Sequence, residues 1–145
     1  MQEKEKYLFL DVDGVLNNTS TKHVLDPSNM KMLKHLVMDV LPYVHIVICT
    51  EWRYTKPALQ ELAREFQKYE IRLWEDITDL VSRHRRPQRE KKILQYLEKH
   101  GIEKDQIMIL DDMDFYRELK IQFVLIDYKV GLSEKDIEEI KERFL

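Results

Sequence analysis

The chain has 145 residues, of which 43% are hydrophobic and 35% charged, and its net charge is −3. This length fits one domain, spanning residues 1–145, and the composition excludes a disordered chain. A slightly acidic protein is not a general nucleic-acid binder, so any contact with a polyanion must come from a local basic patch. The single cysteine, Cys49, excludes disulfides within the chain and favours a reducing compartment. Because the first apolar segment is too short for a signal peptide or membrane span, we expect a cytoplasmic protein with no membrane partner.

Strands and helices are predicted to alternate along the chain. In order, we expect a strand over 7–12, a helix over 26–41, a strand over 44–49, a helix from 57, a short strand over 71–73, a helix over 89–100, strands over 106–110 and 123–126, and a terminal helix from 133. Strands that are apolar on both faces and alternate with helices are typical of an α/β fold. The sequence therefore predicts a parallel sheet with helices on both faces.

Two carboxylates mark the end of the first predicted strand. The apolar run 7–10 ends in Asp11, and Asp13 follows two residues later, before Gly14. Side chains two positions apart lie on one side of a strand, so we expect both carboxylates to stand together. Repulsion and desolvation make such a pair costly, and a hard cation such as Mg²⁺ would relieve both costs. An Asp-Gly pair also occurs in β-hairpin turns, but the polar residues 17–22 provide no returning strand.

Polar residues also follow other predicted elements. Thr50 follows the second strand, Asp111 and Asp112 follow the strand that ends at Leu110, and Arg89 begins a helix. Open α/β sheets bind ligands in the crevice beyond the carboxyl ends of their strands. Each residue has a structural alternative, since Thr50 could cap the next helix and the paired acids could form an ordinary turn. Together and in this order, they favour a chemical site.

These motifs resemble those of the haloacid dehalogenase (HAD) superfamily of phosphatases and phosphotransferases across essentially the whole chain. The matching positions are Asp11 and Asp13 in the first motif, Thr50 in the second, Arg89 in the third, and Asp111 and Asp112 in the fourth. Short stretches at 50–53, 89–97, 110–112 and 127–133 are similar to the small HAD domains of RNA-repair proteins and polynucleotide kinase/phosphatases. The resemblance implies a three-layer Rossmannoid sheet, and the short segments between motifs leave no room for a sizeable cap domain.

The resemblance implies a Mg²⁺-dependent phosphomonoester hydrolase that works through an aspartyl-phosphate on Asp11. Asp13 would protonate the leaving alcohol and then deprotonate the attacking water. The metal would bind Asp11, the main-chain carbonyl of Asp13, and either Asp111 or Asp112.

The resemblance also implies which residues bind the substrate phosphate. Thr50 and Arg89 would hold the transferring phosphoryl oxygens, although Lys91 and Lys92 lie close enough to compete with Arg89 for that role. Arg53 could add a bidentate phosphate contact, or it could be a surface arginine on the next helix.

The expected substrate is a nucleotide or polynucleotide phosphate end, because a site without a cap is open to bulky substrates. A basic run beside the third motif could follow a phosphate backbone, or it could be a solvated loop: Arg83, Arg85, Arg86, Arg89, Lys91 and Lys92. Glu51 would repel an anionic substrate if it faced the pocket. The alternatives are a phosphatase of a small metabolite or a protein, and a HAD-like binding module without turnover. No obligate protein partner is evident.

Overall fold

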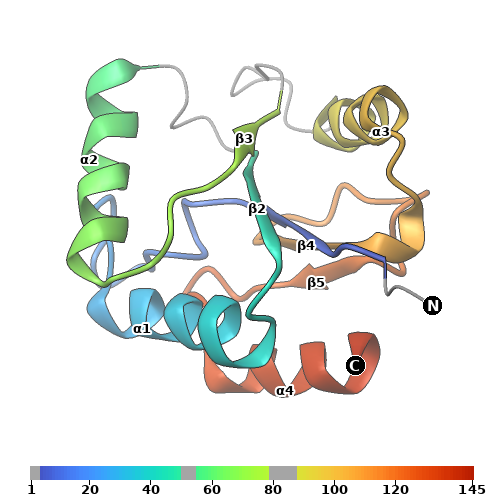
Figure 1. Ribbon diagram of the computed structural model, residues 1–145. Helices are drawn as coiled ribbons and strands as arrows, with labels where there is room; N and C mark the ends of the chain where they lie inside the picture. The colour runs from blue at the N-terminus through green and yellow to red at the C-terminus, as the bar shows by residue number, and fades with distance from the viewer. Residues whose placement is uncertain (1–3, 50–54, 79–87) are drawn as a thin grey trace.

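The structure is a computed structural model that describes residues 4–49, 55–78 and 88–145 (Figure 1). Its strands and α-helices are β1 (Tyr7–Leu10), α1 (Pro27–His35), β2 (His45–Ile48), α2 (Lys56–Lys68), β3 (Asp76–Ile77), α3 (Arg89–His100), β4 (Ile107–Asp111), β5 (Phe123–Leu125) and α4 (Glu134–Phe144). A π-helical turn, Leu36–Val40, extends α1. No helix in these described ranges is long and apolar enough to cross a membrane.

The described strands form one parallel sheet in the order β3-β2-β1-β4-β5, which confirms the predicted α/β class. In the central strand, Leu10 pairs with Ile48 of β2 and with Leu110 of β4. The carboxyl ends of β1, β2 and β4 therefore lie at the same level. Asp11, just after β1, lies next to Asp111, the last residue of β4. The described segments between the strands contain no cap domain.

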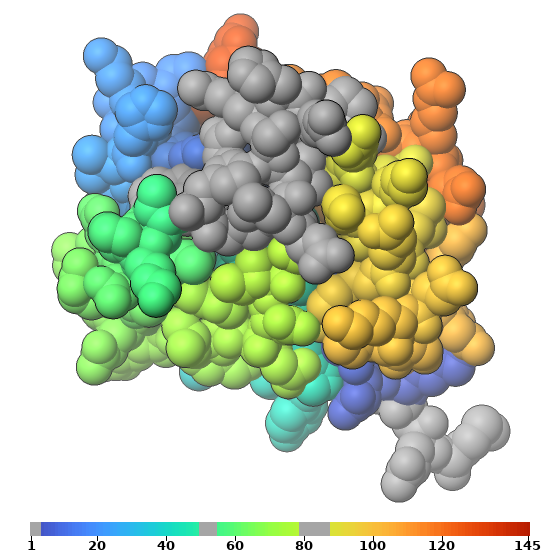
Figure 2. Space-filling view, turned by 90° about the horizontal axis from the view of Figure 1, so that it is seen from above, coloured from blue at the N-terminus to red at the C-terminus, as the bar shows by residue number. Residues whose placement is uncertain are grey.

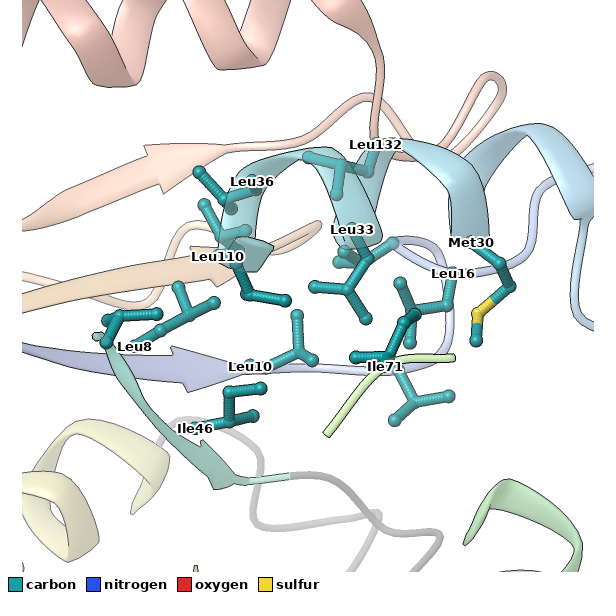
Figure 3. Packing of buried hydrophobic residues seen from close by; sticks show 14 of the residues in the cluster. Leu8, Leu10, Leu16, Met30, Leu33, Leu36, Ile46, Ile71, Leu110 and Leu132 are labelled. Atoms are coloured by element: carbon teal, nitrogen blue, oxygen red, sulfur yellow. The ribbon is translucent and has the colours of Figure 1, made fainter. Parts of the chain in front are cut away.

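Each face of the sheet packs against its own helices, because alternate residues of a strand point in opposite directions. Leu8 and Leu10 belong to a buried cluster that includes residues of α1, α2 and α4 (Figures 1 and 3). Phe9 lies in a second cluster on the opposite face, together with Ile93 and Leu97 of α3. The strands β1, β2 and β4 are buried except for the half-buried Tyr7 and His45, which accounts for their near-continuous apolar runs in the sequence.

The helix boundaries follow from local capping chemistry. Asp26 accepts hydrogen bonds from the amides of Ser28 and Asn29 at the start of α1. Gly101 ends α3 with a φ of 63°, in the left-handed region. Ser133 and Asp136 form a capping box at the start of α4, where the terminal helix was predicted to begin. The α2 helix begins one residue before the predicted Pro57, after an N-cap at Thr55.

The prediction of a strand over 71–73 is wrong, since the third strand is the two-residue β3 at Asp76–Ile77. The Arg72 guanidinium instead donates hydrogen bonds to the carbonyls of Val37 and Val44. This anchor holds the chain beside the end of α1 and the start of β2. The β-type pairing begins further on, where the Glu75 amide bonds to the carbonyl of Ile46.

We predict that Asn29→Ala destabilises the protein, because the buried Asn29 side chain joins α1 to the loop after β5. Its amide nitrogen donates to the carbonyls of Val130 and Leu132 at 3.0 and 2.9 Å. Loss of a donor to buried carbonyls should cost about 1–3 kcal/mol, or several degrees in the melting temperature. Thermal unfolding would measure it, with Ser28→Ala as the control because that residue is exposed. Equal melting temperatures for the two variants would contradict the prediction.

Candidate active site

Three carboxylates from two strands converge at the carboxyl end of the sheet. One oxygen each of Asp11, Asp111 and Asp112 lies within 4.8 Å of the others. Asp11 follows β1, and its amide extends the parallel pairing by donating to the carbonyl of Leu110 at 3.0 Å. Asp11 and Asp111 are buried, at 3% and 0% exposure, so their charges are poorly hydrated. We call these three residues the acidic cluster.

Arg89 is the cation that the structure brings into the acidic cluster. Its Nη1 atom lies 2.5 Å from Oδ2 of Asp111 and 3.5 Å from Oδ1 of Asp11. Burial by itself would lower the pKa of Arg89, but the charges of Asp11 and Asp111 raise that pKa above its ordinary value. Lys91 is exposed and Lys92 half-buried on the same helix. Of these three candidates for the third motif, Arg89 is therefore the one that contacts the acidic cluster.

The surroundings of Asp11 disfavour the negative charge of its carboxylate. Burial and the charges of Asp111 and Asp112 raise the pKa of its carboxyl well above the ordinary range, and Arg89 opposes them only in part. With all three acids ionised, the described side chains in contact here carry two negative charges in excess. A divalent cation would balance this excess, and an all-oxygen donor set suits Mg²⁺. The residues present therefore fit a Mg²⁺ ion.

The two acids of the fourth motif have different surroundings. Oδ2 of Asp111 accepts hydrogen bonds from Arg89 at 2.5 Å and from the Tyr116 hydroxyl at 2.8 Å. Oδ1 of Asp111 accepts the Met113 amide at 3.1 Å. The Asp112 side chain instead packs against Gly14, where a Cβ atom would lie 2.2 Å from Oδ2. Asp111 thus holds Arg89, whereas Asp112 lies beside Gly14.

The Asp13 side chain lies outside the acidic cluster and is half-buried. The strand β1 ends at Leu10, and after Asp11 the chain forms a tight turn, in which the amides of Val15 and Leu16 bond to the carbonyl of Val12. The alternation expected of a continuous strand therefore does not apply to Asp11 and Asp13. Oδ1 of Asp13 accepts a hydrogen bond from Nδ2 of Asn17 at 3.0 Å.

Several predicted phosphate-binding residues lie outside the described parts of the chain. These are Thr50 and Arg53, together with Arg83, Arg85 and Arg86 of the basic run. Glu51, which would repel an anionic substrate if it faced the pocket, also lies outside the described residues. Figure 2 views the molecule from above, with α2 in green and α3 in yellow on opposite sides. The roles of these residues stay predictions.

Three residues that were not predicted from the sequence make hydrogen bonds that hold the predicted site in place: Asn17, Tyr116 and Glu90. Asn17 is buried, and its Oδ1 accepts the Gly14 amide at 2.7 Å while its Nδ2 binds Asp13. An Asn in a polar segment after Asp-Gly is a local signal for such bonding. Tyr116 and Glu90 carry no comparable signal, because their contacts join irregular segments to residues elsewhere in the fold.

We predict that Gly14→Ala disrupts the site, with Gly101→Ala as the matched control. Both glycines have a left-handed φ, +82° and +63°, but only the Cβ at position 14 meets atoms within 4 Å. Gly101→Ala should cost about 1–2 kcal/mol from backbone strain alone. Gly14→Ala should cost more and should also reduce the rise in melting temperature on adding Mg²⁺, since Asp112 must move. An undiminished response to Mg²⁺ in Gly14→Ala would contradict this placement of Asp112.

Comparison with known proteins identifies the family of this chain. A family model described as "HAD domain in Swiss Army Knife RNA repair proteins" matches residues 7–137. A search of the curated proteins found no match. The crystal structure of a hypothetical protein from Xanthomonas campestris is similar at a TM-score of 0.46 and 16% identity, over 83% of this chain and 62% of that one. This chain thus spans less than two thirds of that protein, and a likeness at this level carries no functional argument. Because the family model covers most of the sequence, the chain belongs to the family of HAD domains found in Swiss Army Knife RNA repair proteins.

Proposed function

We propose that the protein is a Mg²⁺-dependent phosphomonoester hydrolase that acts on a nucleotide or polynucleotide phosphate end. The observation that carries the proposal is the acidic cluster of Asp11, Asp111 and Asp112 around the buried cation of Arg89. Hydrolysis of a phosphomonoester needs a nucleophile, a cation that stabilises the phosphoryl oxygens and a proton donor for the leaving group. Membership of a HAD family supports the assignment of these roles.

In the first step, a carboxylate oxygen of Asp11 attacks the phosphorus, and the bond from phosphorus to the leaving oxygen breaks. Asp13 enters this step protonated and gives its proton to the leaving alcohol. Asn17 donates a hydrogen bond to Oδ1 of Asp13 and so helps to hold the Asp13 carboxyl group in place. The leaving group departs as a neutral alcohol, and Asp11 carries the phosphoryl group.

In the second step, water attacks the phosphorus and Asp13 takes up its proton. The bond between phosphorus and the Asp11 oxygen breaks, which restores the Asp11 carboxylate and releases inorganic phosphate. Arg89 stabilises negative charge on the phosphoryl oxygens, with Asp111 keeping its guanidinium in place. Thr50 and Arg53 are proposed to bind the same oxygens, as the second motif implies.

Asp11, Asp112 and the main-chain carbonyl of Asp13 are the proposed metal ligands. Asp112 is proposed rather than Asp111 because Asp112 lies against Gly14, the residue after the Asp13 carbonyl, and because Asp111 already holds Arg89. Bound Mg²⁺ would offset repulsion between Asp11 and the substrate phosphate and would polarise the phosphoryl group.

The proposed substrate class rests on three observations. The matching family model describes domains of RNA-repair proteins. The described segments between strands contain no cap domain that would enclose a small metabolite. The segment leading into α3 is rich in arginine, and α3 itself continues with Lys91 and Lys92.

The first test of the proposal is turnover of phosphorylated substrates. We expect hydrolysis of an aryl phosphate with Mg²⁺ and its loss with EDTA. Asp11→Asn should abolish turnover because an amide cannot form the phosphoenzyme, and Asp13→Asn should slow it by roughly 10²–10⁴-fold. Full activity of Asp11→Asn would refute the mechanism, and inactivity of the wild type on every phosphate ester would favour a binding module.

The second test compares 3′- and 5′-phosphorylated oligonucleotides with mononucleotides and sugar phosphates. An oligonucleotide should give the highest kcat/KM, with a steep loss as salt rises. Replacing Arg83, Arg85 and Arg86 together by Ala should weaken turnover of the oligonucleotide and leave that of the aryl phosphate nearly intact. A sugar phosphate as the best substrate would favour the small-metabolite alternative.

The third test uses stability rather than activity. Because the pKa of Asp11 is raised in the folded state, its contribution to stability is present at acid pH and is lost as pH rises through the folded value. Without Mg²⁺ at neutral pH, Asp11→Asn should therefore melt above the wild type, and the difference should shrink as the pH is lowered. Saturating Mg²⁺ should raise the wild-type free energy of unfolding by about 2–3 kcal/mol at a hundred times Kd, and that of Asp11→Asn by less.

The matched control for this third test is Asp114→Asn, which removes an exposed carboxylate from the loop after β4. It should change neither the melting temperature nor the response to Mg²⁺. An Asp11→Asn variant less stable than the wild type in EDTA would contradict the electrostatic account.

A further inference from the structure

A closed circuit of contacts surrounds the Arg89–Asp111 pair. Arg89 is the first residue of α3 and donates to Asp111, which also accepts the Tyr116 hydroxyl. The next residue of α3, Glu90, accepts the backbone amides of Arg117 and Leu119 through Oε2, at 2.6 and 3.1 Å. The segment 116–119 is therefore attached at one end to the carboxylate that binds Arg89, and along its length to the helix that carries Arg89.

Two side chains of this segment, Tyr116 and Leu119, are buried. Tyr116 is 3% exposed, and its ring packs on Phe123 with the ring centroids 4.6 Å apart. Leu119 is fully buried in the same apolar cluster as Ile93 of α3. The packing fixes the Tyr116 hydroxyl against Asp111, so the hydroxyl limits where the carboxylate can turn. Glu90 fixes the first turn of α3 to the same segment, so the base of the Arg89 side chain is held as well.

We propose that Tyr116 and Glu90 are positioning residues, which set the place of the Arg89 guanidinium relative to the substrate phosphate. This proposal rests on the proposed phosphatase function, because it assumes that Arg89 binds the transferring phosphoryl group. An arginine on the first turn of a helix has a long, flexible side chain, and the loss of rotamer freedom opposes a fixed position. The circuit holds both ends of that side chain before substrate arrives, and such preorganisation lowers the barrier to reaction.

The first experiment removes the Tyr116 hydroxyl with Tyr116→Phe, which keeps the ring packing. We expect kcat/KM for an aryl phosphate to fall about tenfold, the size of effect expected when a hydrogen bond to a charged group is lost. The control is Tyr96→Phe, since the Tyr96 hydroxyl makes a similar bond to Asp76 at 2.9 Å, away from the acidic cluster. Tyr96→Phe should leave kcat/KM near the wild-type value.

A double-mutant cycle separates positioning from general destabilisation. If Tyr116 acts through Arg89, Tyr116→Phe combined with Arg89→Ala should be no slower than Arg89→Ala alone. A purely structural role would instead multiply the two losses. Multiplied losses, or a Tyr116→Phe protein as fast as the wild type, would overturn the proposal while leaving the phosphatase function intact.

The role of Glu90 is tested by rescue. Glu90→Ala removes the acceptor of two backbone amides and should lower kcat/KM about tenfold. Glu90→Gln keeps an acceptor oxygen and should recover most of that loss. Glu98→Ala, an exposed change on the same helix, should have no effect. Equal losses in Glu90→Ala and Glu90→Gln would overturn the assignment of Glu90.

Binding of inorganic phosphate distinguishes failure of this proposal from failure of the proposed function. The shift in melting temperature with phosphate and Mg²⁺ should be smaller in Tyr116→Phe than in Tyr96→Phe. A wild type that binds phosphate without turning over any ester would refute the phosphatase function, and the same comparison would still decide the role of Tyr116. A wild type that neither binds phosphate nor hydrolyses an ester would overturn both.

Discussion

The buried contact between Arg89 and Asp111 is the interaction on which the site depends. A buried arginine and a buried carboxylate are each costly without a partner, and removing either would leave an uncompensated charge. Their contact joins the start of α3 to the end of β4, and the same guanidinium lies 3.5 Å from Asp11 at the end of β1. One cation thus links a helix to two neighbouring strands and determines where three elements meet.

The excess negative charge of the cluster links stability to metal binding. Asp11, Asp111 and Asp112 repel one another, and one arginine offsets that repulsion only in part, which is why the pKa of Asp11 is raised. A protein arranged in this way carries an unfavourable charge distribution in its folded state that a cation would relieve. The same excess charge that lowers the stability of the apo protein would therefore favour binding of Mg²⁺.

Much of the fold could be predicted because its signals are local. The predicted helix boundaries near residues 26, 100 and 133 are confirmed, since the caps at Asp26, Gly101 and Ser133–Asp136 act within a few residues of the chain. The short β3 was misplaced because its position depends on Arg72 binding carbonyls of distant segments, which no local pattern records. The expectation that Asp13 stands together with Asp11 came from strand periodicity, whereas the chain turns away from the sheet after Asp11.

The sequence by itself determined which residue types stand at the ends of the strands, because apolar runs that end in acids can be recognised in the sequence alone. It predicted that Asp11, Arg89, Asp111 and Asp112 would meet, since parallel strands end at one edge of a sheet. Only the tertiary structure decided their pairing: Arg89 bonds to Asp111, and Asp112 packs on Gly14. Asp111 and Asp112 are neighbours of the same residue type, so the sequence does not show which of them binds Arg89. They differ in the direction in which their side chains point. That direction depends on the level register of β1 with β4 and on the packing of α3 and Tyr116.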